Sequence, residues 1–238
     1  MRVVFVHGAC VRDGSWWWHL AAAALQERGI SSVAPALPSC GEADRPAGPQ
    51  GPGLPEDVAA VRAALTEGDE PTVVVGHSYG GIVAAEAAVG IRTVGHMVFV
   101  SSYLPEPGES LSTFGAETPP PFLDLDPDGG TFSVRPELVA QTFLQDCPPD
   151  IARAGEARIV RQTLAVIQQP VRRVAWHDLP TTYVVCAEDR GTPAAAQRQF
   201  SRRADKVIEV TAGHHPFLSQ PQTVADIIAA PGGPGAAG

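Results

Sequence analysis

Ser78 stands in a sequence context that could make its hydroxyl a nucleophile. The segment Gly76–Gly80 reads Gly-His-Ser-Tyr-Gly and matches G-x-S-x-G, the pattern of a serine on a sharp strand-to-helix turn. Such a turn strains the backbone, and glycines on both sides make it sterically possible. A β-branched run, 72–75, precedes the turn and small residues follow it. We therefore interpret Ser78 as a nucleophile rather than as an ordinary turn serine.

A serine hydroxyl is a weak nucleophile near neutral pH and needs a base, which after a G-x-S-x-G turn is expected beyond the last strand. His214 and His215 both qualify by position. A carboxylate must orient this base, and the loop Cys186–Pro193 offers Glu188 and Asp189. We favour Asp189, the usual acid in this arrangement, which stands deeper in the turn. The alternative is that one of the two acids only caps the following helix.

The negative oxygen formed on a substrate carbonyl needs two fixed backbone N–H donors. One is expected from Tyr79, directly after the nucleophile, and the other from the loop after the first strand, which by position is Ala9. Gly8 would let the backbone pass close to the substrate, whereas we interpret His7 as a hydrogen-bonded structural residue. These residues together predict acyl-transfer chemistry.

The elements that must position these residues alternate between strand and helix along most of the chain. The predicted strands are 3–6, 32–36, 72–75, 94–100, 181–186 and 206–210, and the predicted helices are 17–28, 56–67, 80–89 and 221–229. Several strands are apolar enough to be buried on two faces, as a parallel sheet requires. The alternation predicts an α/β fold with a doubly wound, mostly parallel sheet in a single domain.

The regular alternation lapses after residue 103. A proline-rich stretch, 118–130, precedes segments that look helical near 136–145 and 150–168. We therefore expect an inserted, largely helical cap. The predicted organisation is a core of 1–103 and 180–230, a cap subdomain of 104–179 and a disordered tail of 231–238.

Composition narrows the class of protein and of partner. The net charge is −9 and Lys206 is the single lysine, which argues against a nucleic-acid partner. No run of ~18 apolar residues could span a bilayer, and the first apolar run is too short for a signal peptide, so we expect a soluble protein with no membrane partner. Four cysteines without CxxC spacing predict free thiols in a reducing cytoplasm, and suggest neither a zinc site nor disulfides.

Four sequence blocks carry a resemblance to a known family. They are His7–Cys10, Gly76–Gly81, Cys186–Pro193 and Gly213–Pro221. In these blocks the chain resembles the plant methylesterase and hydroxynitrile-lyase branch of the α/β-hydrolase superfamily, and looks still closer to small bacterial esterases. The resemblance covers about 3–228 and implies an α/β-hydrolase fold.

The resemblance also separates the candidate residues. In that family the catalytic histidine lies seven residues before the proline of the last helix, which implies His214. Hydroxynitrile lyases have a lysine at the next position and a threonine after the first strand, where this chain has His215 and Gly8. The chain thus resembles the esterase half of the family.

The predicted function is a serine hydrolase that cleaves a small hydrophobic or aromatic ester, such as a methyl ester or lactone, with no metal or organic cofactor. The alternatives are a lyase or other non-hydrolytic reaction on the same residues, or a weakly catalytic ligand receptor. We expect Trp16–Trp18 to pack in the core. The candidate pocket residues are Gly8, Cys10, His77, Tyr103, Phe114, Phe122, Phe132, Phe143, His215 and Phe217.

Overall fold

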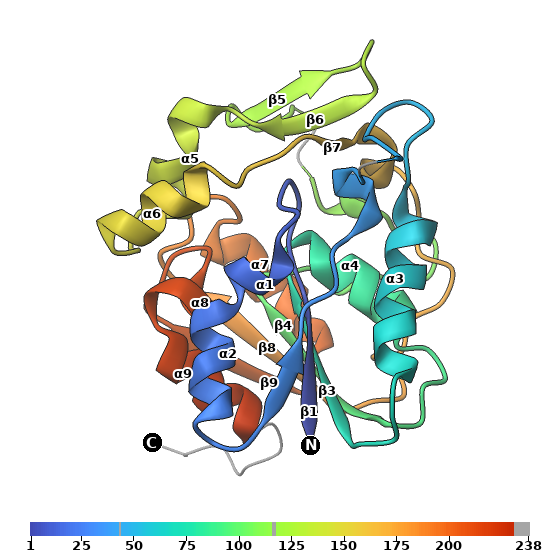
Figure 1. The fold of residues 1–238 in the computed structure, drawn as a ribbon, viewed down its shortest axis with the longest axis vertical. Helices are drawn as coiled ribbons and strands as arrows, with labels where there is room; N and C mark the ends of the chain where they lie inside the picture. The colour runs from blue at the N-terminus through green and yellow to red at the C-terminus, as the bar shows by residue number, and fades with distance from the viewer. Residues whose placement is uncertain (43, 116–117, 231–238) are drawn as a thin grey trace.

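A six-stranded parallel sheet forms the centre of the molecule (Figure 1). The computed structural model describes residues 1–42, 44–115 and 118–230, so the predicted disordered tail, 231–238, lies outside the described residues. The strands are β1 (Arg2–Val6), β2 (Ser31–Val33), β3 (Thr72–His77), β4 (Val94–Val100), β8 (Thr181–Cys186) and β9 (Lys206–Val210). Their order is β2-β1-β3-β4-β8-β9 and every neighbouring pair is parallel, which confirms the predicted doubly wound sheet.

Helices cover both faces of the sheet because its strands are apolar on both sides. One face carries α2 (His19–Gln26), α8 (Pro216–Ser219) and α9 (Pro221–Ala229), and the other carries α3 (Leu54–Thr66), α4 (Tyr79–Ala87) and α7 (Ala194–Phe200). Side chains alternate between these faces: Val3 and Phe5 of β1 pack in the core under α2, whereas Val4 and Val6 pack under α3 and α4. The one predicted helix over 17–28 is instead two, α1 (Gly14–Trp17) and α2.

The candidate catalytic residues follow the carboxyl ends of the strands. Ser78 follows β3, Asp189 follows β8 and His214 follows β9, so the parallel sheet brings them to one edge. β1 and β3 are neighbours, yet the chain continues from β1 toward β2 and from β3 toward β4, on opposite sides. Such a switch point is where α/β proteins bind ligands.

The inserted segment between β4 and β8 is not largely helical, as expected from the sequence, but part sheet and part helix. It contains β5 (Leu123–Asp126), β6 (Thr131–Val134), β7 (Gln162–Thr163), α5 (Pro136–Phe143) and α6 (Pro149–Glu156). The three strands form an antiparallel sheet in the order β5-β6-β7. Short 3-10 turns complete the fold at Pro38–Cys40, Leu111–Phe114, Leu164–Ile167 and Ser201–Arg203.

Local turn chemistry explains the β5-β6 hairpin that we did not predict. The connecting segment Pro127–Gly130 contains Asp-Gly-Gly; Asp126 Oδ1 accepts from the Gly129 N–H at 2.9 Å, and Gly130 has φ of 59°. The predicted helix 150–168 ends at Glu156 because the following chain pairs instead with β6.

The cap, which we define as residues 104–179, lies with β5, β6, α5 and α6 across the end of the central sheet (Figure 1). It contacts the loop after β1: Val11 forms a bridge with Ile159, and the Val160 N–H donates to the Cys10 carbonyl at 2.8 Å. Its behaviour as a separate subdomain stays a prediction. Over the described residues, none of the helices has the length and apolar character needed to cross a membrane.

Candidate active site

Ser78 occupies a strained turn between β3 and α4. Its backbone angles are φ 49° and ψ −126°, a region that non-glycine residues rarely adopt and that clusters at functional sites. Neighbouring glycines allow the turn: a Cβ on Gly76 would lie 2.8 Å from Gly81 Cα, and one on Gly80 would lie 2.3 Å from the Val6 carbonyl oxygen. The strained serine is half-buried and lines a cavity.

Asp189 and His214 form a buried pair beside this turn. Asp189 Oδ2 lies 2.7 Å from His214 Nδ1, and the two residues are 7% and 4% exposed. Asp189 Oδ1 accepts from the N–H groups of Gly191 at 2.8 Å and Thr192 at 2.9 Å. Burial by itself raises the pKa of Asp189, but the charge of His214 and the accepted hydrogen bonds lower it below its usual value. The carboxylate is therefore held ionised against the imidazole.

Two residues that the sequence reasoning missed also bind this carboxylate. Ser101 follows β4 with φ of 42°, and its hydroxyl donates to Asp189 Oδ2 and lies 3.2 Å from His214 Nδ1. Gln197 in α7 donates from Nε2 to the same oxygen at 2.9 Å. A polar residue directly after a buried strand was the available signal for Ser101. Gln197 had none, because its contact depends on how α7 packs.

The structure distinguishes the two adjacent histidines by their partners. His214 contacts the Asp189 carboxylate, whereas His215 Nδ1 donates to the Phe143 carbonyl oxygen at 2.9 Å. Burial lowers the pKa of His215 to about 3, so this ring is neutral at pH 7. His77 donates from Nε2 to the His214 carbonyl oxygen at 2.9 Å, and burial lowers its pKa well below the usual value. Only the His214 ring, among these three, meets a carboxylate.

Both residues expected to supply backbone donors lie at the wall of the same cavity. Tyr79 is the first residue of α4, where backbone N–H groups have no partner within the helix and the helix dipole is positive. Ala9 lies in the loop after β1. His7 supports that loop, donating from Nδ1 to the Gly8 carbonyl at 2.9 Å and accepting from the Leu37 N–H at 3.1 Å. Its predicted structural role is thus confirmed.

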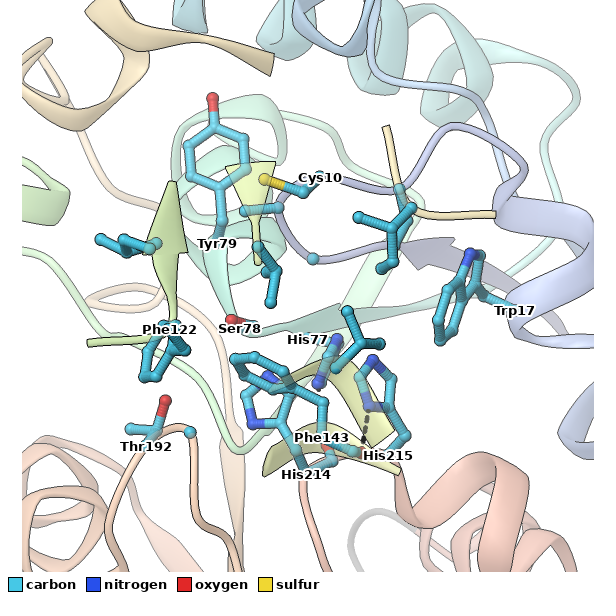
Figure 2. A pocket seen from close by; sticks show the side chains of 18 of the residues that line it. Cys10, Trp17, His77, Ser78, Tyr79, Phe122, Phe143, Thr192, His214 and His215 are labelled. Carbon is cyan, nitrogen blue, oxygen red and sulfur yellow. Dashed lines mark hydrogen bonds between the residues drawn. The ribbon is translucent and has the colours of Figure 1, made fainter. Parts of the chain in front are cut away.

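The cavity has a volume of about 120 Å³ and is mostly apolar. Figure 2 shows Ser78 with Tyr79 on one side and the rings of His77, His214 and His215 on the other. Predicted pocket residues that line the cavity are Gly8, Cys10, His77, Tyr103, Phe122, Phe132, Phe143 and His215. Thr192 lines the cavity as well, and so does Trp17, which is at the same time buried in the core as expected.

The prediction that Phe217 and Phe114 line the cavity is wrong. Phe217 is buried on the α2 side of the sheet, where its ring stacks on Trp18 with a centroid distance of 3.8 Å. Phe114 lies behind the wall residue Tyr103, with ring centroids 5.2 Å apart, and packs edge-on against Phe200. Neither phenylalanine lines the cavity. Aromatic character alone could not separate wall from core.

Within the described part of the chain, His77, His214 and His215 form the group that could hold a metal ion. Each offers a ring nitrogen, and the three nitrogens lie within 4.8 Å of one another. Each ring also has an oxygen partner for a nitrogen, an arrangement that orients metal-binding imidazoles. An ion bound there would occupy His214, so metal binding and base chemistry at that ring exclude each other.

Known proteins resemble this chain over nearly its whole length. Polyneuridine aldehyde esterase from Rauvolfia serpentina is 26% identical over 247 residues, covering 93% of this chain and 91% of that protein. Methylesterase 1 from Arabidopsis thaliana is 25% identical over 247 residues, covering 94% and 92%. The crystal structure of a pyrethroid hydrolase from Sphingobium faniae JZ-2 superposes with a TM-score of 0.84 at 22% identity, covering 96% of both chains.

These comparisons confirm the predicted resemblance to plant methylesterases and the α/β-hydrolase fold. A carbendazim hydrolyzing esterase from Nocardioides sp., 25% identical over 243 residues, confirms the resemblance to bacterial esterases. The relatives are named esterases and hydrolases, and with the fold they support carboxylic-ester hydrolase activity. The model of the alpha/beta hydrolase family matches residues 3–227. The chain belongs to the alpha/beta hydrolase family.

Proposed function

We propose that this protein hydrolyses small hydrophobic or aromatic carboxylic esters through an acyl-enzyme on Ser78. The observation that carries the proposal is the 2.7 Å contact between Asp189 and His214 beside the strained Ser78 turn, with Ser78 and His214 both lining one cavity. In this arrangement the carboxylate holds the imidazole in one orientation and stabilises its charged form. The remaining ring nitrogen of His214, Nε2, is the base.

The reaction proceeds in two acyl-transfer steps. His214 takes the Ser78 proton as the serine oxygen attacks the ester carbonyl, and the N–H groups of Tyr79 and Ala9 hold the resulting oxyanion. His214 then gives the proton to the departing alcohol as the carbon–oxygen bond breaks, leaving the acyl group on Ser78. In the second step water loses a proton to His214 and attacks the acyl carbon, and His214 then gives that proton to the Ser78 oxygen as the bond to the acyl group breaks and the acid leaves.

The size and lining of the cavity support a small apolar ester. A volume of about 120 Å³ compares with the roughly 150 Å³ apolar cavity that binds benzene in another protein, so one ring or a short chain fills it. Aromatic walls from Phe122, Phe132 and Phe143 favour an apolar group over a charged one. We include a small-molecule ester as the ligand and, because all four cysteines are free thiols, a cytoplasmic location in the proposal.

A substrate panel tests this proposal. Wild-type protein and Ser78→Ala are assayed on methyl esters, lactones, thioesters and cyanohydrins of matched acyl size. We expect hydrolysis of the esters by the wild type and a loss of at least about 10³-fold in the variant. Cyanide release from the cyanohydrins without ester hydrolysis would contradict the proposal, as would ester hydrolysis at the wild-type rate by Ser78→Ala.

A further inference from the structure

A continuous chain of buried hydrogen bonds runs behind the cavity from the loop after β1 to the first residue of α4. Gln162 Oε1 accepts from the Cys10 N–H at 2.9 Å, and Gln162 Nε2 donates to Ser39 Oγ at 2.7 Å. The Ser39 hydroxyl donates to Asp57 Oδ2 at 2.6 Å, and the Tyr79 hydroxyl donates to the same oxygen at 2.8 Å. Each hydrogen-bond donor in this chain of contacts is thus paired with an acceptor.

The chain joins parts of the molecule that are distant in sequence. Gln162 comes from β7 in the cap, Ser39 from the 3-10 turn Pro38–Cys40, and Asp57 from the first turn of α3. Gln162, Ser39 and Asp57 are 0% exposed. Burying a carboxylate and an amide is costly unless each is fully hydrogen-bonded, and such networks fix one arrangement of the groups they join.

The ionised form of Asp57 suits its role as the common acceptor. Burial raises the pKa of this carboxyl to about 6, against the hydrogen bonds from Ser39 and Tyr79 that lower it. At pH 7 and above the group is therefore mostly charged. It accepts the Tyr79 and Ser39 hydroxyls on Oδ2, and the Ser39 N–H on Oδ1 at 2.8 Å. Charged acceptors make the stronger hydrogen bonds.

Both ends of the chain meet the expected oxyanion donors. At one end the anchored group is the N–H of Cys10, the residue directly after Ala9. At the other end it is the side chain of Tyr79, whose own backbone N–H is the second donor. In Figure 2 the Tyr79 ring points away from the histidines, so its hydroxyl serves the chain behind the cavity.

We propose that this chain of hydrogen bonds sets the positions of the two oxyanion donors, and that Asp57 and Gln162 are positioning residues for ester hydrolysis. The inference rests on the proposed function, because it assigns the chain a role in the same reaction. Donors that are fixed before the oxyanion forms stabilise the transition state without reorganising. The chain fixes Ala9 through Cys10 and fixes Tyr79 through Asp57.

One consequence is that the position of the cap affects the position of an oxyanion donor. β7 pairs with β6, and Phe132 of β6 lines the cavity, so a substrate that moves this small sheet also moves Gln162. Cys10 has a second link to the same sheet, since its Sγ lies 3.8 Å from the Phe132 carbonyl oxygen. The oxyanion donor at Ala9 therefore depends on where the cap rests.

Three variants and a matched control test the inference. Tyr79→Phe deletes one buried hydroxyl, Gln162→Met removes both amide hydrogen bonds at nearly constant volume, and the third variant combines the two. The control is Thr181→Val, which also deletes one buried hydroxyl bonded to an aspartate, Asp205, but at the start of β8 on the opposite edge of the sheet. Thermal unfolding of each variant accompanies the kinetics.

We expect Tyr79→Phe and Gln162→Met each to lower kcat about tenfold with KM within twofold, because oxyanion contacts act only in the transition state. The double variant should lose less than the product of the single losses, since either change already breaks the chain. An aryl trifluoromethyl ketone forms an adduct that places an oxyanion in the same position, so it should bind to each single variant about tenfold more weakly than to the wild type. Thr181→Val should keep kcat and KM within twofold.

The inference is overturned by folded single variants whose kcat stays within twofold of the wild type, by losses confined to KM, or by multiplicative losses in the double variant. Should Gln162→Met fail to fold, Tyr79→Phe decides alone, with the same kcat and ketone criteria. The parent proposal is separated by Ser78→Ala: wild-type hydrolysis in that variant refutes the proposed function. A dead Ser78→Ala beside a fully active Tyr79→Phe refutes only the positioning role.

Discussion

The hydroxyl of Ser101 donates a hydrogen bond to Asp189 Oδ2, the carboxylate oxygen that also lies 2.7 Å from His214 Nδ1. This hydroxyl is buried and shares an acceptor with the imidazole. It therefore helps to fix the carboxylate in the position from which it orients the base.

Ser101→Ala should lower kcat about fivefold, because the carboxylate loses one of the donors that hold it in place. Its removal should also raise the pKa of Asp189, since a hydrogen bond to the charged form lowers that pKa. Steady-state ester hydrolysis measures the effect. The control is Ser110→Ala in the cap, whose hydroxyl meets Ser112 Oγ at 2.8 Å. Equal rates for both variants would show that Ser101 does not help to position the Asp189 carboxylate.

The two adjacent histidines should differ sharply in a substitution experiment. His214→Ala should lower kcat about 10⁴-fold, because it deletes the base that contacts Asp189. His215→Ala should lower kcat less than tenfold, since that ring bonds a backbone carbonyl and contributes wall area. Single-turnover kinetics on one chromogenic ester compare them. A larger loss in His215→Ala would reverse the assignment.

Zinc should inhibit the enzyme, whereas chelators should leave its activity unchanged. The ring nitrogens of His77, His214 and His215 lie within 4.8 Å of one another, and neutral imidazoles bind zinc. An ion held there takes the lone pair that His214 needs as a base. Initial rates in EDTA and in increasing Zn²⁺ test this, and a chelator that abolishes activity would instead indicate a required metal.

The free energy of unfolding should fall as the pH is lowered, and protonation of His7 in the unfolded state is one cause. Burial lowers its pKa from 6.5 to about 4, so between these values the unfolded state binds a proton that the folded state excludes. Stability from this group is full above about pH 6.5 and is lost toward pH 4. His215, with its pKa lowered to about 3, acts in the same direction, whereas the raised pKa of Asp57 opposes both between about pH 4 and 6.

Urea unfolding of wild type and His7→Gln at pH 7, 6 and 5 isolates this contribution. In the pH range below 6.5 the wild type should lose up to about 1.4 kcal/mol per pH unit more than the variant. The difference in slope is the measured quantity, because the substitution also changes stability at every pH. Identical slopes would show that His7 does not titrate between the folded and unfolded states.

The core of the fold and the central residues could be predicted because they depend on local patterns. The strand bounds 94–100, 181–186 and 206–210 were predicted to the residue, since apolar runs ended by turn residues mark buried strands. The structure places Ser78 and His214 at one cavity and Asp189 in contact with His214, in the chain order that the motif implied. Their catalytic roles stay predictions.

What could not be predicted depends on tertiary pairing. The two-residue strand β7 exists because it pairs with β6, and no local periodicity marks it. Gln162 lies in that strand, so its position beside Cys10 was equally invisible in the sequence. Trp17 packs in the core, as expected, yet also borders the cavity, and Phe217 lies in the core instead of the wall; both outcomes depend on how the short helix α1 and the segment after β9 pack.

The acyl-enzyme on Ser78 is tested most directly by intact-protein and peptide mass spectrometry after reaction with a fluorophosphonate and, separately, after rapid quenching of a slow ester. We predict one adduct per chain, on the peptide that contains Ser78, formed by wild type and absent from Ser78→Ala. His214→Ala should form it far more slowly. Stoichiometric acylation of another residue, or turnover of the ester with no adduct on Ser78 at any time, would contradict the account.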